Sequence, residues 1–367
     1  MIGSWQKVAD ILNELLEKHY SESAYRKKRQ SFDAMLDAYH TKTPDLKAEL
    51  EEIKKERREL EKEKVKVRDE RNEYRRLIRE QARRESFLDL VGRVISEETE
   101  SLTLDKDLQI IRTDCDLLAH LTDIHTGIKI DNGFNRFDEE VLKRRLNRYL
   151  NKIISIRNTH HAENCYLVIG EILSGIIHNN MRLENNMDLI EQFKTVSELI
   201  ALLIQELAQH FTGVHIYVTP GNHSRISPKK EDSLDGENMD LLLPFYLSAR
   251  LQNIKNVYIH ENTKNPEIAM FNIRGHLVVA THGHKDNPNT VARDISMMYG
   301  KQPSIILLGH RHTNGYQTDS NVKVIQSGCI SGSDSYATSI RKVNDPEQTV
   351  SVINDDGLDC IYDITLK

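Results

Sequence analysis

Five short blocks of polar residues constrain the fold of this chain, because each follows a run of apolar residues typical of a buried strand. The blocks contain aspartate, glutamate, asparagine and histidine, which are side chains that bind divalent metal ions. The carboxyl ends of strands are where open α/β sheets build their sites. In chain order the blocks are Asp123-Ile124-His125, Gly170-Glu171, Gly221-Asn222-His223, His282-Gly283-His284 and Gly309-His310-Arg311-His312.

Strands and helices alternate from about residue 100 onward, which predicts an α/β domain. The strands that lead into the five blocks are expected at 116–122, 165–170, 214–219, 277–281 and 305–308. Amphipathic helices are expected at 138–156 and 186–211, and further strands at 257–260, 322–326 and 360–365. Two metal ions held at such strand ends, about 4 Å apart, can activate water and clamp a phosphate, so the pattern points to a phosphoester hydrolase.

Composition limits the location of the chain and its contacts with nucleic acid. The net charge is -6, so binding to nucleic acid has to come from a local basic surface or from bound metal. The chain begins without a signal-peptide pattern, and its longest apolar stretch, at 199–207, is too short to span a bilayer. No membrane association is therefore expected. The cysteines are far apart and form no CxxC pair, which favours free thiols in a cytoplasmic protein.

Residues 1–43 form the first predicted unit, a pair of helices joined by a short turn. Apolar residues recur with helical spacing over 8–16, and Ser21 or Ser23 is placed to cap a second helix. Helix, turn and basic helix loosely resemble the helix-turn-helix units of phage-type DNA-acting proteins. A helical hairpin that packs on a neighbour and leaves a solvated basic face is the alternative. The predicted DNA-binding residues are Arg26, Lys27, Lys28 and Arg29.

Residues 44–100 form the second predicted unit, a long charged helix that starts after Pro44. Residues 45–85 contain no Gly or Pro, and an apolar residue recurs every seven positions. A coiled coil needs a second apolar series in the same seven-residue repeat, but basic residues occupy three of the five positions of that series. Two structures therefore fit. One is a coiled coil that forms a homodimer or folds back on itself, and the other is a spacer helix held by i,i+4 ion pairs. The apolar series is Leu46, Ile53, Leu60, Val67 and Tyr74.

The five blocks together resemble the pattern D-x-H, G-D, G-N-H, H, G-H-x-H of the calcineurin-like metallophosphoesterase superfamily, over about residues 110–330. A single block would be weak support, because one Asp or His is more often a core or surface residue than a ligand. The resemblance implies an α/β fold in which residues 101–367 form a four-layer sandwich of two mixed sheets flanked by helices. The preceding residues would form an N-terminal helical arm.

The resemblance also implies which residues hold two divalent metal ions, with manganese expected and iron, zinc or magnesium as alternatives. Glu171 would bridge the two ions. A hydroxide held between them would attack phosphorus, and His223 would act as the general acid. The first ion would be held by Asp123, His125 and His312, and the second by Asn222, His282 and His310.

Three further residues are expected near the substrate or the ligands. His284 follows the ligand His282 by two positions and is expected to contact a ligand or the phosphate. Arg311 lies between two ligands and would contact the phosphate, or alternatively would point to a surface carboxylate. His178 follows the second block closely enough to reach the substrate. His120 is expected to pack in the core.

Three positions depart from the family pattern. Glu171 stands where the family has Asp, so its carboxylate reaches further, and either metal spacing or metal occupancy changes. Ser174 and Ser224 stand where acidic residues are usual, which argues against a protein phosphatase and leaves open what orients His223.

The substrate is not fixed by the fold, because the superfamily acts on several classes of phosphoester. The N-terminal unit favours DNA as the substrate, and the double-strand-break repair nucleases of this superfamily, which use manganese, are the type it resembles. A phosphodiesterase or phosphatase acting on small molecules or nucleotides is one alternative. A DNA-binding regulatory protein with a weakened metal site is the other, and Glu171 favours it.

Overall fold

The computed structural model describes residues 4–42, 51–75, 78, 102–104, 112–177, 185–229, 233–234 and 236–367. The chain divides into two compact units, Met1–Arg93 and Val94–Lys367. The finer boundaries expected near residues 43 and 100 stay predictions.

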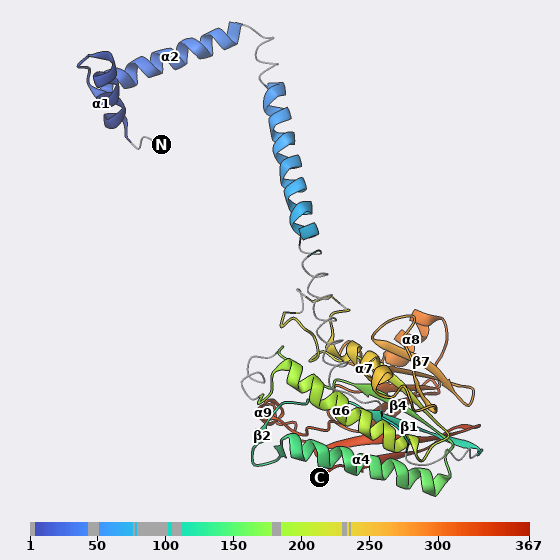
Figure 1. The fold of residues 1–367 in the computed structure, drawn as a ribbon. Coiled ribbons are helices and arrows are strands. Elements are labelled where there is room, and N and C mark those ends of the chain that lie inside the picture. The colour runs from blue at the N-terminus through green and yellow to red at the C-terminus, as the bar shows by residue number, and fades with distance from the viewer. Residues whose placement is uncertain are drawn as a thin grey trace. The chain divides into compact units, whose positions relative to one another are not determined.

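The first unit contains two helices, α1 (Trp5–Leu16) and α2 (Glu22–Lys42), joined by a short turn (Figure 1). Ser21 caps α2, since its hydroxyl accepts the backbone N–H of Ala24 at 3.3 Å. The Asn13 side chain fixes the turn by accepting the backbone N–H of Tyr20 and the hydroxyl of Tyr25, both at 2.9 Å. Helix, turn and basic helix are therefore present as expected.

The described part of the long charged segment, residues 51–75, is helical, and every one of these residues is exposed. The apolar heptad residues Ile53, Leu60, Val67 and Tyr74 are each more than half exposed, at 57–65%. Residues 45–50 and most of 76–85 lie outside the described residues. The coiled coil and the spacer helix both stay predictions.

The second unit is built on two mixed sheets. The first sheet has the strand order β13-β12-β1-β4-β5-β6. Strands β1, β4, β5 and β6 are parallel to one another, and β12 runs antiparallel to both of its neighbours, β1 and β13. The strands of the first sheet are β1 (Cys115–Leu121), β4 (Asn164–Gly170), β5 (Gly213–Thr219), β6 (Val257–Ile259), β12 (Glu347–Asn354) and β13 (Gly357–Thr365). The second has the order β10-β11-β9-β8-β7, with β7 (Ile268–Ile273), β8 (His276–Thr281), β9 (Ile305–Leu308), β10 (Gly315–Asp319) and β11 (Val322–Gln326).

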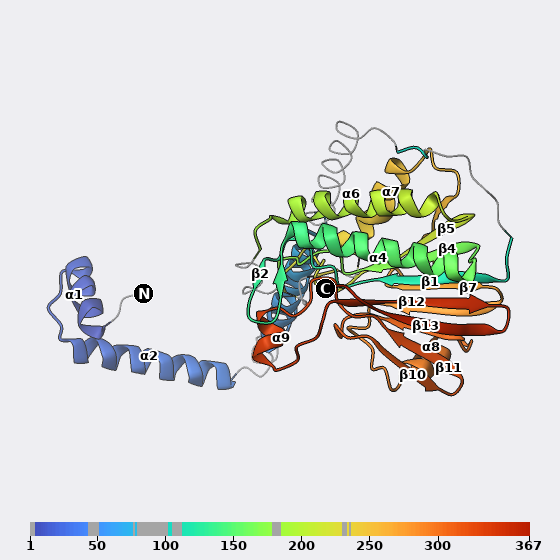
Figure 2. The ribbon, with the colours of Figure 1, turned by 90° about the horizontal axis from the view of Figure 1, so that it is seen from below.

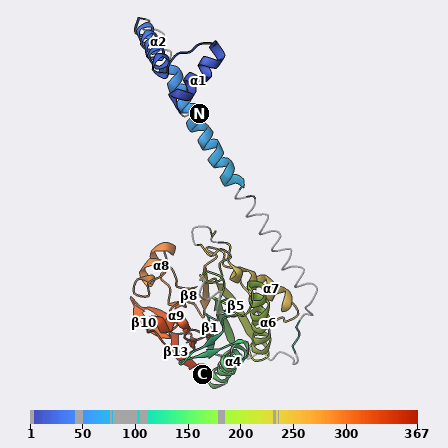
Figure 3. The same cartoon turned by 90° about the vertical axis from the view of Figure 1, so that its left-hand side faces the viewer.

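Alternating side chains place the two sheets between helical layers. In β9, Ile305 and Leu307 face the core between the sheets, whereas Ile306 and Leu308 face the opposite side with residues of α8 (Val291–Tyr299). Helices α4 (Glu139–His160) and α6 (Leu189–Ala208) cover the first sheet (Figure 2). Figure 3 shows α8 on the other side of the sheets from α4 and α6. The predicted four-layer sandwich is confirmed.

Most of the strands and helices around the five blocks agree with the expectations. The elements that were not expected lie elsewhere in the second unit. The sequence did not indicate β7, β10, β12, the short pair β2 (Ile130–Asp131) and β3 (Arg136–Phe137), or the helices η2 (Met239–Leu242), α7 (Leu243–Arg250), α8 and α9 (Ser335–Ser339). Helix α6 is shorter than the expected 186–211, because Asp188 caps its start and forms a capping box with Glu191.

Candidate metal centre

The five blocks meet because their strands are neighbours. Strands β1, β4 and β5 are adjacent and parallel in the first sheet, and β8 and β9 are adjacent and parallel in the second. Parallel strands end at the same edge, so the loops that follow them converge. The two edges are joined by hydrogen bonds such as that from the His310 backbone N–H to Asp123 Oδ2, at 2.9 Å.

Five of the predicted ligands have a left-handed backbone, with φ between 47° and 66°. Residues other than glycine seldom adopt this conformation, and it costs about 1–3 kcal/mol where the surroundings enforce it. Such residues cluster at functional sites, and here they follow strand ends that would otherwise continue straight. They are Asp123, His125, Glu171, His310 and His312.

Asp123, His125 and His312 form one group of donors. Asp123 is fully buried, and its Oδ2 accepts the Thr122 hydroxyl at 2.9 Å in addition to the His310 N–H. Its Oδ1 has no hydrogen bond and lies 3.2 Å from His312 Nε2 and 3.7 Å from His125 Nε2. The two Nε2 atoms are 3.2 Å apart. One carboxylate oxygen is therefore held by the fold, and the other faces two imidazoles.

Glu171 lies between the two groups of predicted ligands. Its Oε2 accepts the backbone N–H of Asn222 at 2.9 Å, its Oε1 accepts that of His223 at 2.5 Å, and Oε2 lies 2.6 Å from His282 Nε2. Ligand atoms of Glu171, His282 and Asp123 lie within 4.8 Å of one another, as do those of Glu171, His125 and His223. Despite its extra methylene, Glu171 therefore occupies the position expected of a bridging carboxylate.

The third and fifth blocks begin with a glycine because the carboxylate of a predicted ligand packs against each of these two positions. A Cβ atom at Gly221 would lie 2.1 Å from Glu171 Oε2, and one at Gly309 would lie 2.7 Å from Asp123 Oδ2. Any side chain at either position would displace the carboxylate.

His282, His310 and His284 lie together on the other side of Glu171. The rings of His282 and His310 are 5.1 Å apart between centroids, and those of His282 and His284 are 5.5 Å apart. Asn222 is placed by the bond from its backbone N–H to Glu171. The arrangement agrees with the expected second group of ligands, and it places His284 beside the ligands.

The donor set fits divalent metal ions. Buried donor atoms without hydrogen-bond partners include Asp123 Oδ1, Asn222 Oδ1, His282 Nδ1 and His284 Nδ1. Buried polar atoms are rarely left unpaired in proteins. The 3.2 Å separations in the Asp123 group also match neighbouring ligands of one ion, which are about 3.0–3.4 Å apart when bonds are 2.0–2.1 Å.

The charges at the centre suit this role. Burial alone would raise the pKa of the Asp123 and Glu171 carboxyls, but the facing imidazoles, His282 foremost, hold both pKa values below their usual range. Burial, with the nearby His282, lowers the pKa of His310 to about 4 and that of His284 to about 3. At neutral pH the carboxylates are ionised and these two imidazoles are neutral, which is the state in which such groups bind metal. Against its burial, Glu171 and Asp123 raise the pKa of His282, so this imidazole has to release its proton when it binds an ion.

His223 projects into the same region. Its ring makes an edge contact with that of His125, with centroids 4.8 Å apart, and its Nδ1 lies 3.2 Å from the carbonyl oxygen of Ser174. Since a carbonyl only accepts, Nδ1 carries the proton in this contact. A backbone carbonyl thus orients His223 where an acidic side chain would have been the familiar partner. His120 is buried in β1 as expected.

Asp240 was not predicted, yet it supports two of the blocks. It is fully buried at the start of η2, where its Oδ2 accepts the backbone N–H groups of Glu171 at 3.1 Å and Gly221 at 2.9 Å. Its Oδ1 accepts the N–H of Ile172 at 3.3 Å. Burial and the neighbouring Glu171 raise the pKa of Asp240 to about 6. No local pattern distinguishes it from a helix-capping residue.

Cys329 was also missed. It follows β11, and its Sγ lies within 4.8 Å of ligand atoms of both His125 and His312. Its thiol donates to the backbone carbonyl of Asp123 at 3.1 Å. The available signal was that Ser327-Gly328-Cys329 follows a predicted strand end, as the five blocks do. Arg145 of α4 holds this loop, since its guanidinium donates to the carbonyls of Ile330 and Ser331, both at 2.8 Å.

Several predicted residues lie apart from the centre or outside the described residues. Arg311 is exposed, and its guanidinium donates to the Asp286 carbonyl at 3.2 Å. His178 lies outside the described residues. In the first unit, Arg26 pairs with Glu22, Arg29 pairs with Asp33 at 2.8 Å, and Lys28 lies 3.9 Å from the centre of the Tyr20 ring. Lys27 is exposed.

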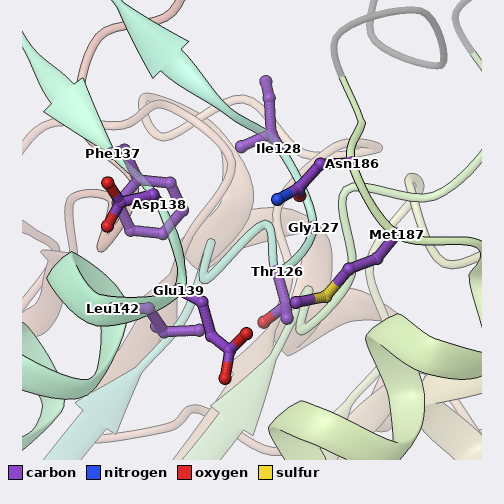
Figure 4. A pocket seen from close by; sticks show the side chains of 9 residues that line it. All are labelled: Thr126, Gly127, Ile128, Phe137, Asp138, Glu139, Leu142, Asn186 and Met187. Carbon is purple, nitrogen blue, oxygen red and sulfur yellow. The ribbon is translucent and has the colours of Figure 1, made fainter.

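A small cavity lies near the first block but is no substrate site. Figure 4 shows the residues around it, which include Thr126, Phe137 and Met187. Its volume of about 10 Å³ is about that of one water probe. A single water there would satisfy the buried Thr126 hydroxyl, which has no partner.

Comparison with known proteins agrees with this geometry. Residues 117–331 match the calcineurin-like phosphoesterase family, and residues 1–44 match the YonJ N-terminal domain. The chain belongs to the calcineurin-like phosphoesterase family. Members of this family are generally metal-dependent hydrolases that bind divalent ions, so this phosphoesterase is expected to be one.

Among the relatives of this phosphoesterase is the SPbeta prophage-derived uncharacterized protein YonJ of Bacillus subtilis (strain 168). It is 22% identical over 349 residues, which cover 92% of this chain and 85% of the relative. A novel archaeal phosphodiesterase is 13% identical, with a TM-score of 0.34, over 68% of this chain and 99% of that one. Zinc-complexed Vps29 from Entamoeba histolytica is 11% identical, with a TM-score of 0.29, over the same shares of the two chains.

Among the residues that the structure describes, none of the helices combines the length and the apolarity that a bilayer crossing requires.

Proposed function

We propose that this phosphoesterase is a two-metal phosphodiester hydrolase that cleaves DNA, with manganese as its metal. The observation that supports the hydrolase is the convergence of two carboxylates, an amide and four histidines, with His223 beside them. Ligand atoms of Asp123, Glu171 and His282, and those of His125, Glu171 and His223, lie within 4.8 Å of one another. Asp123, His125 and His312 would hold one ion, Asn222, His282 and His310 the other, and Glu171 both. When bound, the two ions supply Lewis acidity and an activated water.

The residues of the chain would perform the remaining work. The αL backbone and the buried hydrogen bonds of Asp123 and Glu171 hold the donors in place before substrate arrives. His223, with Nδ1 held by the Ser174 carbonyl, would present its other nitrogen to the leaving oxygen and donate a proton there.

The first unit supports DNA as the substrate. The four basic residues of α2 lie in a helix-turn-helix arrangement, and their partners are exposed acids or an aromatic ring. Exposed ion pairs contribute little stability, so phosphates can compete for these cations. A homodimer formed through residues 45–85, and a cytoplasmic location, are further parts of the proposal.

The hydrolase is tested with bis-p-nitrophenyl phosphate and manganese, with metal content measured in parallel. Turnover by the unaltered protein supports the proposal. Glu171→Asp restores the residue usual in the family and serves as the comparison. If both forms carry two metals and both are inert, the hydrolase proposal fails and a DNA-binding regulatory protein takes its place, which Glu171 already favours.

The substrate is tested on linear, nicked and single-stranded DNA, with His223→Ala as the inactive control. Cleavage that depends on His223 supports the nuclease. Intact DNA under conditions in which nucleotide diesters are cleaved would instead assign the activity to small molecules.

DNA binding by α2 is tested by electrophoretic shift. We expect replacement of Arg26, Lys27, Lys28 and Arg29 by Gln to weaken binding and to flatten its salt dependence. The matched control replaces Lys54, Lys55, Arg57 and Arg58 by Gln, which removes the same charge from an exposed helix. Equal effects of the two variants would reject a specific role of α2, as would unchanged binding after deletion of residues 1–43.

A further inference from the structure

Arg225 lies beside the candidate metal centre, in the lining of a cleft that also contains Asn222 and His284. Within the described residues its side chain makes no hydrogen bond or ion pair, and its Nε is buried. Buried donors are normally satisfied, so an unsatisfied one next to a catalytic region calls for a ligand.

The other described cations near the centre are already engaged. Arg145 donates to the Ile330 and Ser331 carbonyls, Arg311 donates to the Asp286 carbonyl, and Lys285 lies 2.8 Å from both carboxylate oxygens of Glu267. Among the described residues near the centre, Arg225 is thus the arginine whose guanidinium has no acceptor in the structure.

Arg225 lines a cleft that reaches the metal centre. Asn222 and His284 line the same cleft, together with Lys285, Glu237 and Glu267, and its volume is about 100 Å³. On this measure one water needs about 10–15 Å³, so the cleft admits a group of phosphate size.

The backbone of Arg225 is held in place. Arg225 pairs with Asn238 in an antiparallel bridge, and the Met239 N–H donates to the Ser224 carbonyl at 2.8 Å. The neighbouring Asn238 side chain donates to the Gly221 carbonyl. The backbone of Arg225 therefore keeps a fixed position relative to Asn222, which lies three residues before it.

We propose that Arg225 binds a second phosphate of the substrate, next to the one that is hydrolysed. The inference rests on the proposed phosphodiester hydrolysis and adds a polynucleotide as the substrate class, because only a substrate with consecutive phosphates fills both places. The planar fork of arginine pairs with two phosphate oxygens at once. Arg225 is a specificity-determining residue in this scheme, because it contacts substrate away from the reacting bond.

The experiment compares a dinucleotide that has one phosphodiester with the same dinucleotide carrying an added terminal phosphate. In the unaltered protein we expect the added phosphate to lower KM by about tenfold, as charge-assisted hydrogen bonds typically do. Arg225→Ala should remove this advantage and leave kcat unchanged, and Arg225→Lys should keep part of it. The control, Arg293→Ala, removes an exposed arginine of α8 that is paired with Asp294, and it should change nothing.

A binding readout keeps the inference separate from the proposed function. Fluorescence anisotropy of the two labelled dinucleotides should show the same tenfold difference, which Arg225→Ala abolishes. Turnover of bis-p-nitrophenyl phosphate, which has one phosphate, should be unaffected by Arg225→Ala. Absence of that turnover in the unaltered protein counts against the hydrolase, whereas the anisotropy still decides for or against Arg225.

Two results would overturn the inference. One is an equal loss for substrates with one and two phosphates, which would place Arg225 on the reacting phosphate. The other is an unchanged preference for the added phosphate. One of the two acidic residues of the cleft gives an independent test. Glu237→Gln removes a negative charge from the cleft and should therefore tighten binding of the extra phosphate. Weaker binding would mean that the cleft accepts a cation and not an anion.

Discussion

Asp240 and Glu171 are joined by a buried hydrogen bond in which Asp240 Oδ2 accepts the Glu171 backbone N–H at 3.1 Å. The same oxygen accepts the N–H of Gly221, so one carboxylate ties the end of β4 to the end of β5. The residue predicted to bridge the metals is thus itself held by a second carboxylate, further from the donors.

Removal of this support should cost stability. Asp240→Ala leaves three buried N–H groups without acceptors, and each such group costs about 1–3 kcal/mol, so we expect a loss of about 3 kcal/mol or more in the free energy of unfolding. Urea denaturation measures this loss. Asp240→Asn keeps one acceptor oxygen and the side-chain shape, so its loss should be smaller. Equal stability of Asp240→Ala and the unaltered protein would contradict the prediction.

Glu171→Gln should weaken metal binding without unfolding the protein. The amide keeps the size of the side chain and an oxygen that accepts from Asn222 or His223, but it loses the charge that offsets two dications. We expect a fall of at least about tenfold in manganese affinity by calorimetry. Glu206→Gln, which removes an equal charge from the exposed side of α6, serves as the control. Unchanged affinity in Glu171→Gln would mean that this residue is not a ligand.

His223→Ala should remove turnover and leave the metals in place. Loss of a general acid typically lowers the rate by about 10²–10⁴-fold. Turnover of bis-p-nitrophenyl phosphate and metal content are measured on the same sample. If metal content falls together with activity, His223 is a ligand and not the proton donor; if activity is retained, it is neither.

Acid should destabilise the second unit through a histidine pair between the sheets. His215 Nδ1 lies 3.0 Å from His260 Nε2, and His215 stacks between Tyr166 and Tyr258. Burial, and then His260, lowers the pKa of His215 to about 4, and burial also lowers that of His260. The unfolded chain therefore takes up protons first, so this contribution to stability is complete above about pH 6.5 and is lost as the pH falls toward 4.

His215→Phe tests this pH dependence because it keeps a stacking ring and removes the titrating group. The fall in the urea midpoint between pH 7.5 and pH 5 should be smaller in the variant. Only the difference in slope is diagnostic, since other buried histidines such as His120 and His310 also have lowered pKa values. His276→Gln, at a histidine that reaches the Asp355 carbonyl, is the control, and parallel slopes in all three proteins would reject the assignment.

The strand ends could be predicted from the sequence because their signal is local. A run such as 305–308 is apolar on both faces, since Ile305 faces the neighbouring sheet and Ile306 faces α8. Metal-binding residues directly after such runs indicated both the sheet edge and the donors. The four-layer sandwich came with the family resemblance, whereas the order of the strands within each sheet was not predicted.

The supporting residues could not be predicted because their partners are distant in sequence. Asp240 lies 69 residues from Glu171, and Cys329 lies 206 from Asp123. Arg311 was chosen for its position between two ligands, but its left-handed neighbours turn the backbone and direct it to Asp286. Arg225, which follows the third block, was overlooked because only the structure shows that its guanidinium has no partner.

The left-handed backbone at the ligand positions has a consequence for how this protein acquires its metals. These turns are fixed by hydrogen bonds between elements, such as those from Ile124 N–H to the Glu171 carbonyl and from Ile330 N–H to the Asp123 carbonyl. In zinc fingers, metal binding drives the folding of the chain, whereas here the sheets already hold the backbone turns that position the predicted ligands. We therefore expect ions at these positions to exchange according to their supply in the surroundings, without the protein passing through an unfolded state.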